Sequence, residues 1–203
     1  MINESQMIKE IQMTKDIQMT DEIRMIDQIS LKMISYFGTD ARRIQHTLKV
    51  HELAGLIGRR EGLAGEDLFI LEAAALLHDI GIKESERKYD SSAGKYQEQE
   101  GPPVAAALLD KFRKSGLNES GFNESGLSKS GLKEKSIERI CYLIGHHHTY
   151  TEIDGLDFRA LVEADFLVNI YEEGSSGSAV ISIRDKYFKT ETGIALLDSM
   201  FEK

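Results

Sequence analysis

Four side chains that can bind metal ions lie on the apolar stripes of three predicted helices, and this pattern constrains the fold more than any other feature of the chain. They are His46, His78, Asp79 and Asp165. A polar group buried without a partner costs roughly 1–3 kcal/mol, and a bare charge costs more. Imidazole and carboxylate groups are also the ligands of buried divalent metal ions, so we expect these side chains to converge on a metal site.

The spacing of the apolar residues predicts the direction of each of these side chains. Apolar residues follow His46 at i+4, i+7, i+8 and i+11, so this histidine begins the buried stripe of its helix. His78 lies seven residues after Leu71 on the stripe of the next helix. Asp165 lies on the stripe that begins at Phe158. Three helices are therefore expected to direct ligand-type residues to one place.

A fourth predicted helix points toward the same kind of site. Its apolar stripe continues onto His147 and His148, and the phase favours these two residues over His146. The helix is expected to end near Gly145. The alternative is that the three histidines form a solvated helix end, where a histidine suits the negative end of the helix dipole.

The order H…HD…D, formed by the four side chains above, resembles the signature of the HD superfamily of metal-dependent phosphohydrolases. Ala73–Gly81 is similar to the central helix of that motif, with Gly81 as its stop, and Glu163–Asp165 is similar to the element that carries the last ligand. The resemblance extends over residues 40–173. It implies an all-helical domain that hydrolyses a phosphate ester or phosphoanhydride, often of a nucleotide. It also implies a metal bound by His46, His78, Asp79 and Asp165.

The resemblance leaves the number of metal ions open at one or two. Two-metal members carry extra histidines between the HD pair and the last aspartate, and His147 and His148 match one of these positions. The histidine usually found at the start of the intervening helix is missing here. Glu100 is a candidate oxygen ligand in its place. Alternatively, Glu100 simply precedes a helix whose first turn is set by Pro102 and Pro103.

The ligand types also limit the chemistry. A mixed histidine and carboxylate site suits Fe, Mn, Zn, Co or Ni and does not single one out. A bound metal ion lowers the pKa of its water and polarises a phosphoryl oxygen. Asp79 is expected to bridge two metals or to orient the nucleophilic water.

A phosphorylated substrate also needs cations near the metal. Lys83, four residues after the HD pair, is the predicted catalytic cation, and Arg43, one turn before His46, is a candidate substrate contact. Lys95 and Tyr96 lie in a segment of turn residues, where the aromatic ring and the cation are expected to hold a base or a sugar. The alternative for each basic residue is a solvated surface charge.

Composition restricts the class of protein. A chain of 203 residues with 41% hydrophobic residues can bury one core. Its net charge of −9 argues against a nucleic-acid surface and against anionic membranes. It has no apolar run long enough for a membrane span and no signal-peptide pattern. The single cysteine, Cys141, excludes an intramolecular disulfide. A cytoplasmic location is expected.

Two repeat segments lie outside this pattern. The first 34 residues contain a six-residue repeat of helix-forming residues, and residues 35–203 are expected to form the hydrolase domain. The extension is interpreted as a helix that packs on the domain or on another subunit, giving a homo-oligomer, or alternatively as a partly ordered segment. A five-residue Ser-Gly repeat predicts a surface loop over residues 115–135.

The sequence thus predicts an all-α HD-domain helical bundle with an N-terminal helical extension. Its expected function is a metal-dependent phosphohydrolase that acts on a small phosphorylated metabolite, such as a nucleotide. One alternative is a catalytically silent regulatory module that binds a metal or a nucleotide. The other is an HD-type di-iron oxygenase, which would need O₂ for turnover.

Overall fold

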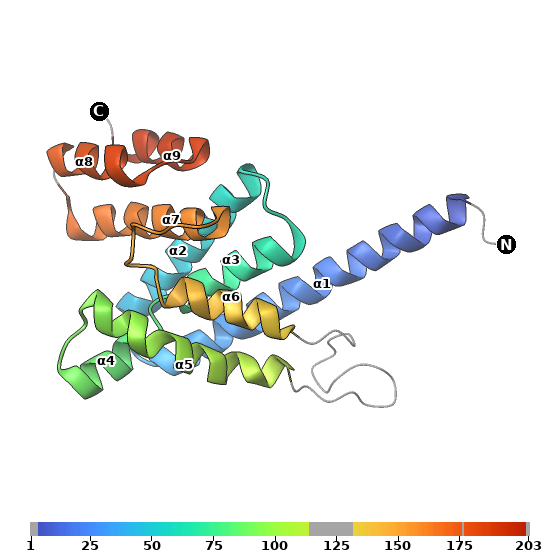
Figure 1. Ribbon diagram of the computed structural model, residues 1–203, viewed down its shortest axis with the longest axis horizontal. Helices are drawn as coiled ribbons and strands as arrows, with labels where there is room; N and C mark the ends of the chain where they lie inside the picture. The colour runs from blue at the N-terminus through green and yellow to red at the C-terminus, as the bar shows by residue number, and fades with distance from the viewer. Residues whose placement is uncertain (1–3, 114–131, 176, 202–203) are drawn as a thin grey trace.

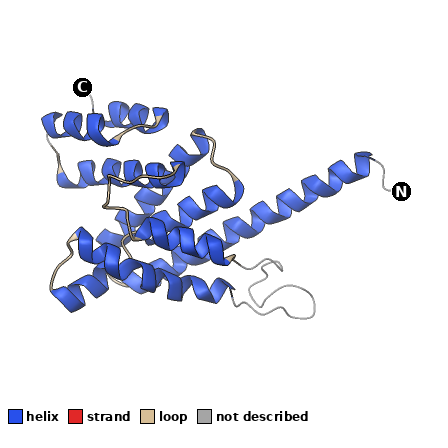
Figure 2. Cartoon of the chain, in the orientation of Figure 1, coloured by secondary structure: helices blue, strands red, loops and turns tan. Residues whose placement is uncertain are grey.

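The computed structural model describes residues 4–113, 132–175 and 177–201, and every regular element in these ranges is an α-helix (Figure 2). The prediction of an all-helical fold is therefore confirmed. None of the described helices is long and apolar enough to cross a membrane. In chain order the helices are α1 (Glu4–Phe37), α2 (Ala41–Arg60), α3 (Gly65–Leu77), α4 (Ile82–Tyr89), α5 (Gly94–Arg113), α6 (Glu134–Ile144), α7 (Leu156–Glu173), α8 (Gly177–Tyr187) and α9 (Glu191–Phe201).

Helix α3 lies at the centre of the fold because its second half is apolar on every side. All five residues from Ala73 to Leu77 are fully buried. A helix that is apolar all round must be surrounded by other elements. Helices α1, α2, α6 and α7, labelled in Figure 1, pack against α3. The residues that follow α3 are consequently held inside the molecule.

Helix α3 ends at Leu77, before the stop expected at Gly81. The chain continues in a tight turn, in which the backbone N–H of Ile80 donates to the carbonyl oxygen of Leu77. Gly81 serves a different purpose from the predicted one. A Cβ atom at this position would lie 2.6 Å from both the carbonyl oxygen of Gln97 and the backbone nitrogen of Gly101. The absence of a side chain therefore allows the turn to pack closely against α5.

Helix α5 begins earlier than expected. Its first residue is Gly94, and the helix continues through Pro102 and Pro103, which were expected to set its first turn. A proline inside a helix removes one backbone hydrogen bond and costs about 3 kcal/mol. Packing of α5 against both α4 and α6 outweighs this cost. Lys95 and Tyr96 therefore belong to the first turn of a helix and not to a loop.

Helix α1 carries the N-terminal repeat and projects from the rest of the molecule (Figure 1). Its C-terminal half packs on the core through Met25, Ile29, Met33 and Phe37, all of which are buried. The helix runs without a break past residue 34, so the domain boundary predicted there stays a prediction. Residues 115–131 of the loop predicted over 115–135 lie outside the described residues.

The last two helices are attached to the body through one buried carboxylate. Glu163 on α7 is fully buried and accepts hydrogen bonds from the backbone N–H groups of Lys189 (2.6 Å) and Thr190 (3.0 Å). It also accepts one from the hydroxyl of Thr190. These donors lie at the start of α9, whose first N–H groups have no partner within the helix. Glu163 thus caps α9 from a neighbouring helix.

Replacing Glu163 by alanine is expected to lower the free energy of unfolding by about 2–4 kcal/mol, because three buried or half-buried donors lose their acceptor. Denaturant-induced unfolding measures this change. Glu173→Ala on the same helix is the matched control, since Glu173 is exposed, and we expect its effect to stay within about 0.5 kcal/mol. Equal effects of the two substitutions would contradict the capping role.

Candidate metal centre

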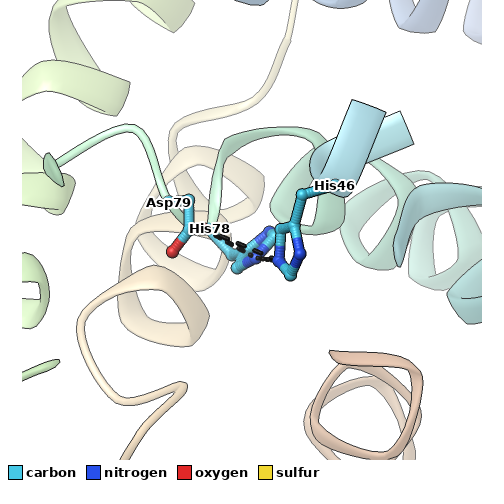
Figure 3. Close-up of side chains that lie close together, drawn as sticks. All are labelled: His46, His78 and Asp79. Atoms are coloured by element: carbon cyan, nitrogen blue, oxygen red, sulfur yellow. Dashed lines mark hydrogen bonds and ion pairs between the residues drawn. The ribbon is translucent and has the colours of Figure 1, made fainter. Parts of the chain in front are cut away.

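Four side chains from three helices meet in the interior. The Nε2 atoms of His46 on α2 and His78, at the end of α3, are 3.3 Å apart. The Oδ1 atom of Asp165 on α7 lies 3.2 Å from Nε2 of His46 and 3.7 Å from Nε2 of His78. The Oδ2 atom of Asp79 lies 3.6 Å from both ring nitrogens. Figure 3 shows the two imidazoles facing each other beside Asp79.

These distances fit a metal site. Ligand atoms that each lie about 2.0–2.1 Å from one ion in tetrahedral geometry are about 3.3 Å apart. The separations of 3.2 to 3.7 Å around Nε2 of His46 are close to this value. The structure therefore brings together the four side chains that the sequence analysis selected. His46, His78 and Asp79 each offer a ligand atom within 4.8 Å of those of the other two, and Asp165 lies beside both imidazoles.

Hydrogen bonds at Nδ1 fix the tautomers of the two histidines. Nδ1 of His78 lies 2.8 Å from the carbonyl oxygen of Ala75, which can only accept, so Nδ1 carries the proton. Nδ1 of His46 lies 3.2 Å from a carboxylate oxygen of Glu172 and donates in the same way. In the neutral form of each ring, the lone pair of Nε2 therefore points toward the other ligands. This is the arrangement that metal-binding histidines adopt.

A second group of ligand-type residues adjoins the first. Asp79, His147 and His148 each offer an atom within 4.8 Å of those of the other two. Nδ1 of His147 donates to the carbonyl oxygen of Ile144 at 2.7 Å, which leaves its Nε2 as the free lone pair. Within the described part of the chain, the buried Nε2 atoms of His147 and His148 have no hydrogen-bond partner. Two orphaned imidazole nitrogens next to a carboxylate fit a second cation.

Asp79 belongs to both groups. Its Oδ2 atom faces His46 and His78, and its Oδ1 atom lies 3.7 Å from Nε2 of His147. One carboxylate thus directs an oxygen to each set of histidines. This geometry supports the expectation that Asp79 bridges two ions.

The charges of the group shift its pKa values in opposite directions. Burial lowers the pKa of His46, but the hydrogen bond and charge of Asp165 outweigh burial and raise it to about 9. Burial, together with the charge of His147, lowers the pKa of His148 to about 4. Burial opposes ionisation of Asp79, yet the neighbouring His78 and His147 keep the pKa of Asp79 below its ordinary value. Near neutral pH and without a metal ion, Asp79 is ionised, His148 is neutral and His46 is cationic, with a proton on both ring nitrogens.

Glu100, the proposed replacement for the missing histidine, is a member of neither group among the described residues. It is buried, but its carboxylate accepts hydrogen bonds from the ammonium of Lys88 and the hydroxyl of Tyr89. The structure therefore does not bring Glu100 to the other candidate ligands. Gln97, one turn earlier on α5, is also buried, and its Oε1 has no partner among the described residues.

The basic side chains that were predicted to act on the substrate form contacts with other groups. Lys83 donates from Nζ to the carbonyl oxygen of Tyr36 on α1 at 2.7 Å, so its position gives no support to a catalytic role. Arg43 forms a two-pronged ion pair with Glu86 and also contacts Asp40.

Lys95 and Tyr96, the preferred substrate contacts, remain near each other. Nζ of Lys95 lies 4.5 Å from the centre of the Tyr96 ring. The ring of Tyr96 also stacks on that of Tyr89, with a centroid separation of 4.2 Å and an interplanar angle of 9°. One face of Tyr96 is therefore already covered, and no described contact joins this pair to the candidate metal ligands.

Sequence reasoning missed three polar side chains around the group. Glu172 orients His46, and Asn169 donates to Oδ1 of Asp165 at 2.9 Å. Their spacing on α7, four and seven residues after Asp165, was a usable signal because such residues share a helix face. Tyr150 gave no such signal. Its hydroxyl lies 3.4 Å from Nδ1 of His148, from a loop whose course the sequence does not specify.

Comparison with known proteins gives one match. Residues 43–187 match the HD domain family, and this span is more than half of the chain and contains every candidate ligand described above. Searches of curated proteins and of solved structures found no match. The resemblance deduced from the order of the ligand-type residues is therefore confirmed.

The affinity for a divalent ion is expected to rise by up to about tenfold per pH unit and to level off near pH 9. The reason is that His46, with its pKa raised to about 9, must release a proton before Nε2 can bind a cation. Competition titrations with a metal chelator between pH 6 and 10 measure this slope. A flat profile across that range would show that no ligand with a raised pKa loses a proton when the ion binds.

Glu172→Ala is expected to weaken metal affinity about 10- to 100-fold, because His46 loses the acceptor that fixes its ring. The adjacent Glu173→Ala is the control, since Glu173 is exposed. Metal dissociation constants measured at one pH distinguish the two variants. An unchanged constant in Glu172→Ala would remove Glu172 from the site.

Proposed function

Because this chain belongs to the HD domain family, we propose that it is a metal-dependent phosphohydrolase that cleaves a phosphate ester of a small metabolite. The observation that carries the proposal is the position of Asp79, whose two oxygens face two separate sets of buried imidazoles. A divalent ion held there supplies a water of lowered pKa and positive charge for the phosphoryl oxygens.

The residues of the chain have separate parts in this proposal. His46, His78, Asp79 and Asp165 would hold the first ion, and Asp79, His147 and His148 would hold a second. Asp79, kept ionised by the neighbouring imidazoles, also accepts a hydrogen bond from the attacking water and orients it toward phosphorus. Glu172 and the backbone carbonyls of Ala75 and Ile144 keep the rings aligned. Fe, Mn, Zn, Co and Ni all accept this ligand set.

The charge around the group favours a substrate with a single phosphate. Several basic side chains on α2, α4 and α6 are already paired with carboxylates: Arg43 with Glu86, Lys49 with Glu172, Lys88 with Glu100, and Arg139 with Asp154 and Asp157. Polyphosphates carry more negative charge and need further cations to hold them. We therefore place phosphomonoesters, nucleoside monophosphates among them, before triphosphates.

The test is hydrolysis of a panel of mono-, di- and triphosphates by the full chain, loaded in turn with each candidate ion. Phosphate release with a monoester is the expected result. Asp79→Asn should reduce turnover by at least about a thousandfold, since charge and ligation are lost together. Asp90→Asn is the matched control, because Asp90 is exposed and has a positive φ of 50°, which asparagine also adopts.

Three outcomes would decide against the proposal. Metal binding without hydrolysis of any phosphate would favour a silent binding module. Turnover that requires O₂ would favour an oxygenase. Full activity of Asp79→Asn would exclude the site itself.

A further inference from the structure

Tyr150 lies beside the second group of ligands and is held there from several sides. Its ring packs on Phe166, the residue after Asp165, with 5.0 Å between centroids, and on Tyr187 of α8 with 4.9 Å. The preceding residues of its loop are fixed to α5, because Glu98 accepts hydrogen bonds from the backbone N–H of His148 and from the hydroxyl of Thr149. The half-buried phenol therefore has a defined position close to the candidate metal ligands.

The hydrogen-bond direction at Tyr150 follows from the tautomer of His148. Nε2 of His148 is buried and has no described partner, which is the state of a nitrogen that binds a cation. A nitrogen that binds a cation carries no proton, so the proton of the neutral ring is on Nδ1. Nδ1 lies 3.4 Å from the Tyr150 oxygen, which then accepts from it. The hydroxyl proton of Tyr150 is consequently left for another acceptor.

The described surroundings offer no such acceptor. His148 is the one hydrogen-bond partner that the described structure gives to the Tyr150 hydroxyl. The acids Asp165 and Glu98 act on the phenol through their charges without bonding to it. A donor that is uncharged, fixed in position and next to a metal site matches the needs of an anionic substrate, whose oxygens accept hydrogen bonds.

We propose that the Tyr150 hydroxyl donates a hydrogen bond to a phosphoryl oxygen of the substrate. This proposal rests on the proposed phosphohydrolase function and adds a residue that contacts the substrate to it. The two hydrogen bonds then form a chain: Nδ1–H of His148 donates to the phenol oxygen, and the phenol O–H donates to the phosphoryl group. It provides recognition of the substrate by a neutral group.

The test compares Tyr150→Phe with Tyr187→Phe in the metal-loaded full chain. Both variants lose one hydroxyl from the same aromatic cluster, and only the first hydroxyl contacts a candidate ligand. For Tyr150→Phe we expect kcat/KM for the preferred monoester to fall about 10- to 100-fold. The inhibition constant of inorganic phosphate should rise by at least about tenfold. Metal content and melting temperature should not change, and Tyr187→Phe should behave as the wild type.

Two results would overturn the proposal. Wild-type kcat/KM and phosphate inhibition in Tyr150→Phe would show that the hydroxyl does not contact the substrate. Loss of bound metal in that variant would show that Tyr150 only supports His148. If the wild type itself neither hydrolyses a phosphate nor binds inorganic phosphate, the proposed function fails, and this inference fails with it.

Discussion

The fold depends on the requirement that α3 be enclosed. Its second half is apolar on every side, so exposing any face of it to water would be unfavourable, and four helices surround it. The consequence is that the C-terminal end of α3, with His78 and Asp79, lies inside the molecule. The C-terminal end of a helix carries partial negative charge, which favours a cation there. The enclosing helices α2 and α7 and the residues after α6 provide the remaining ligands.

The candidate site is oriented mainly by groups outside it. The backbone carbonyls of Ala75 and Ile144 and the carboxylate of Glu172 each bind the outer nitrogen of one imidazole. These contacts fix the tautomers before any ion arrives, so little ring movement is needed to bind one. The close approach of α5 to the turn after α3, which Gly81 permits, limits the space on the remaining side.

The sequence predicted the parts of this structure that depend on helical phase. Apolar spacing placed His46, His78 and Asp165 on inward faces, and the structure brings their side chains together. It predicted the end of α6 near Gly145, but it did not predict the end of α3 or the start of α5, because these depend on packing between distant segments. Close contact with α5 determines the turn at Gly81, and packing carries α5 through Pro102 and Pro103.

The same limit applies to single polar residues. Glu100 was a reasonable ligand by chemical type, but the structure pairs it with Lys88 and Tyr89 on α4, a contact that no local pattern encodes. The sharing of Asp79 between two groups has a further consequence. If each group holds an ion, the two ions would share one carboxylate, so the occupancy of either group would change the affinity of the other. By thermodynamic linkage such a coupling would be reciprocal, and removing one ion would alter the retention of the second by the same factor as the reverse.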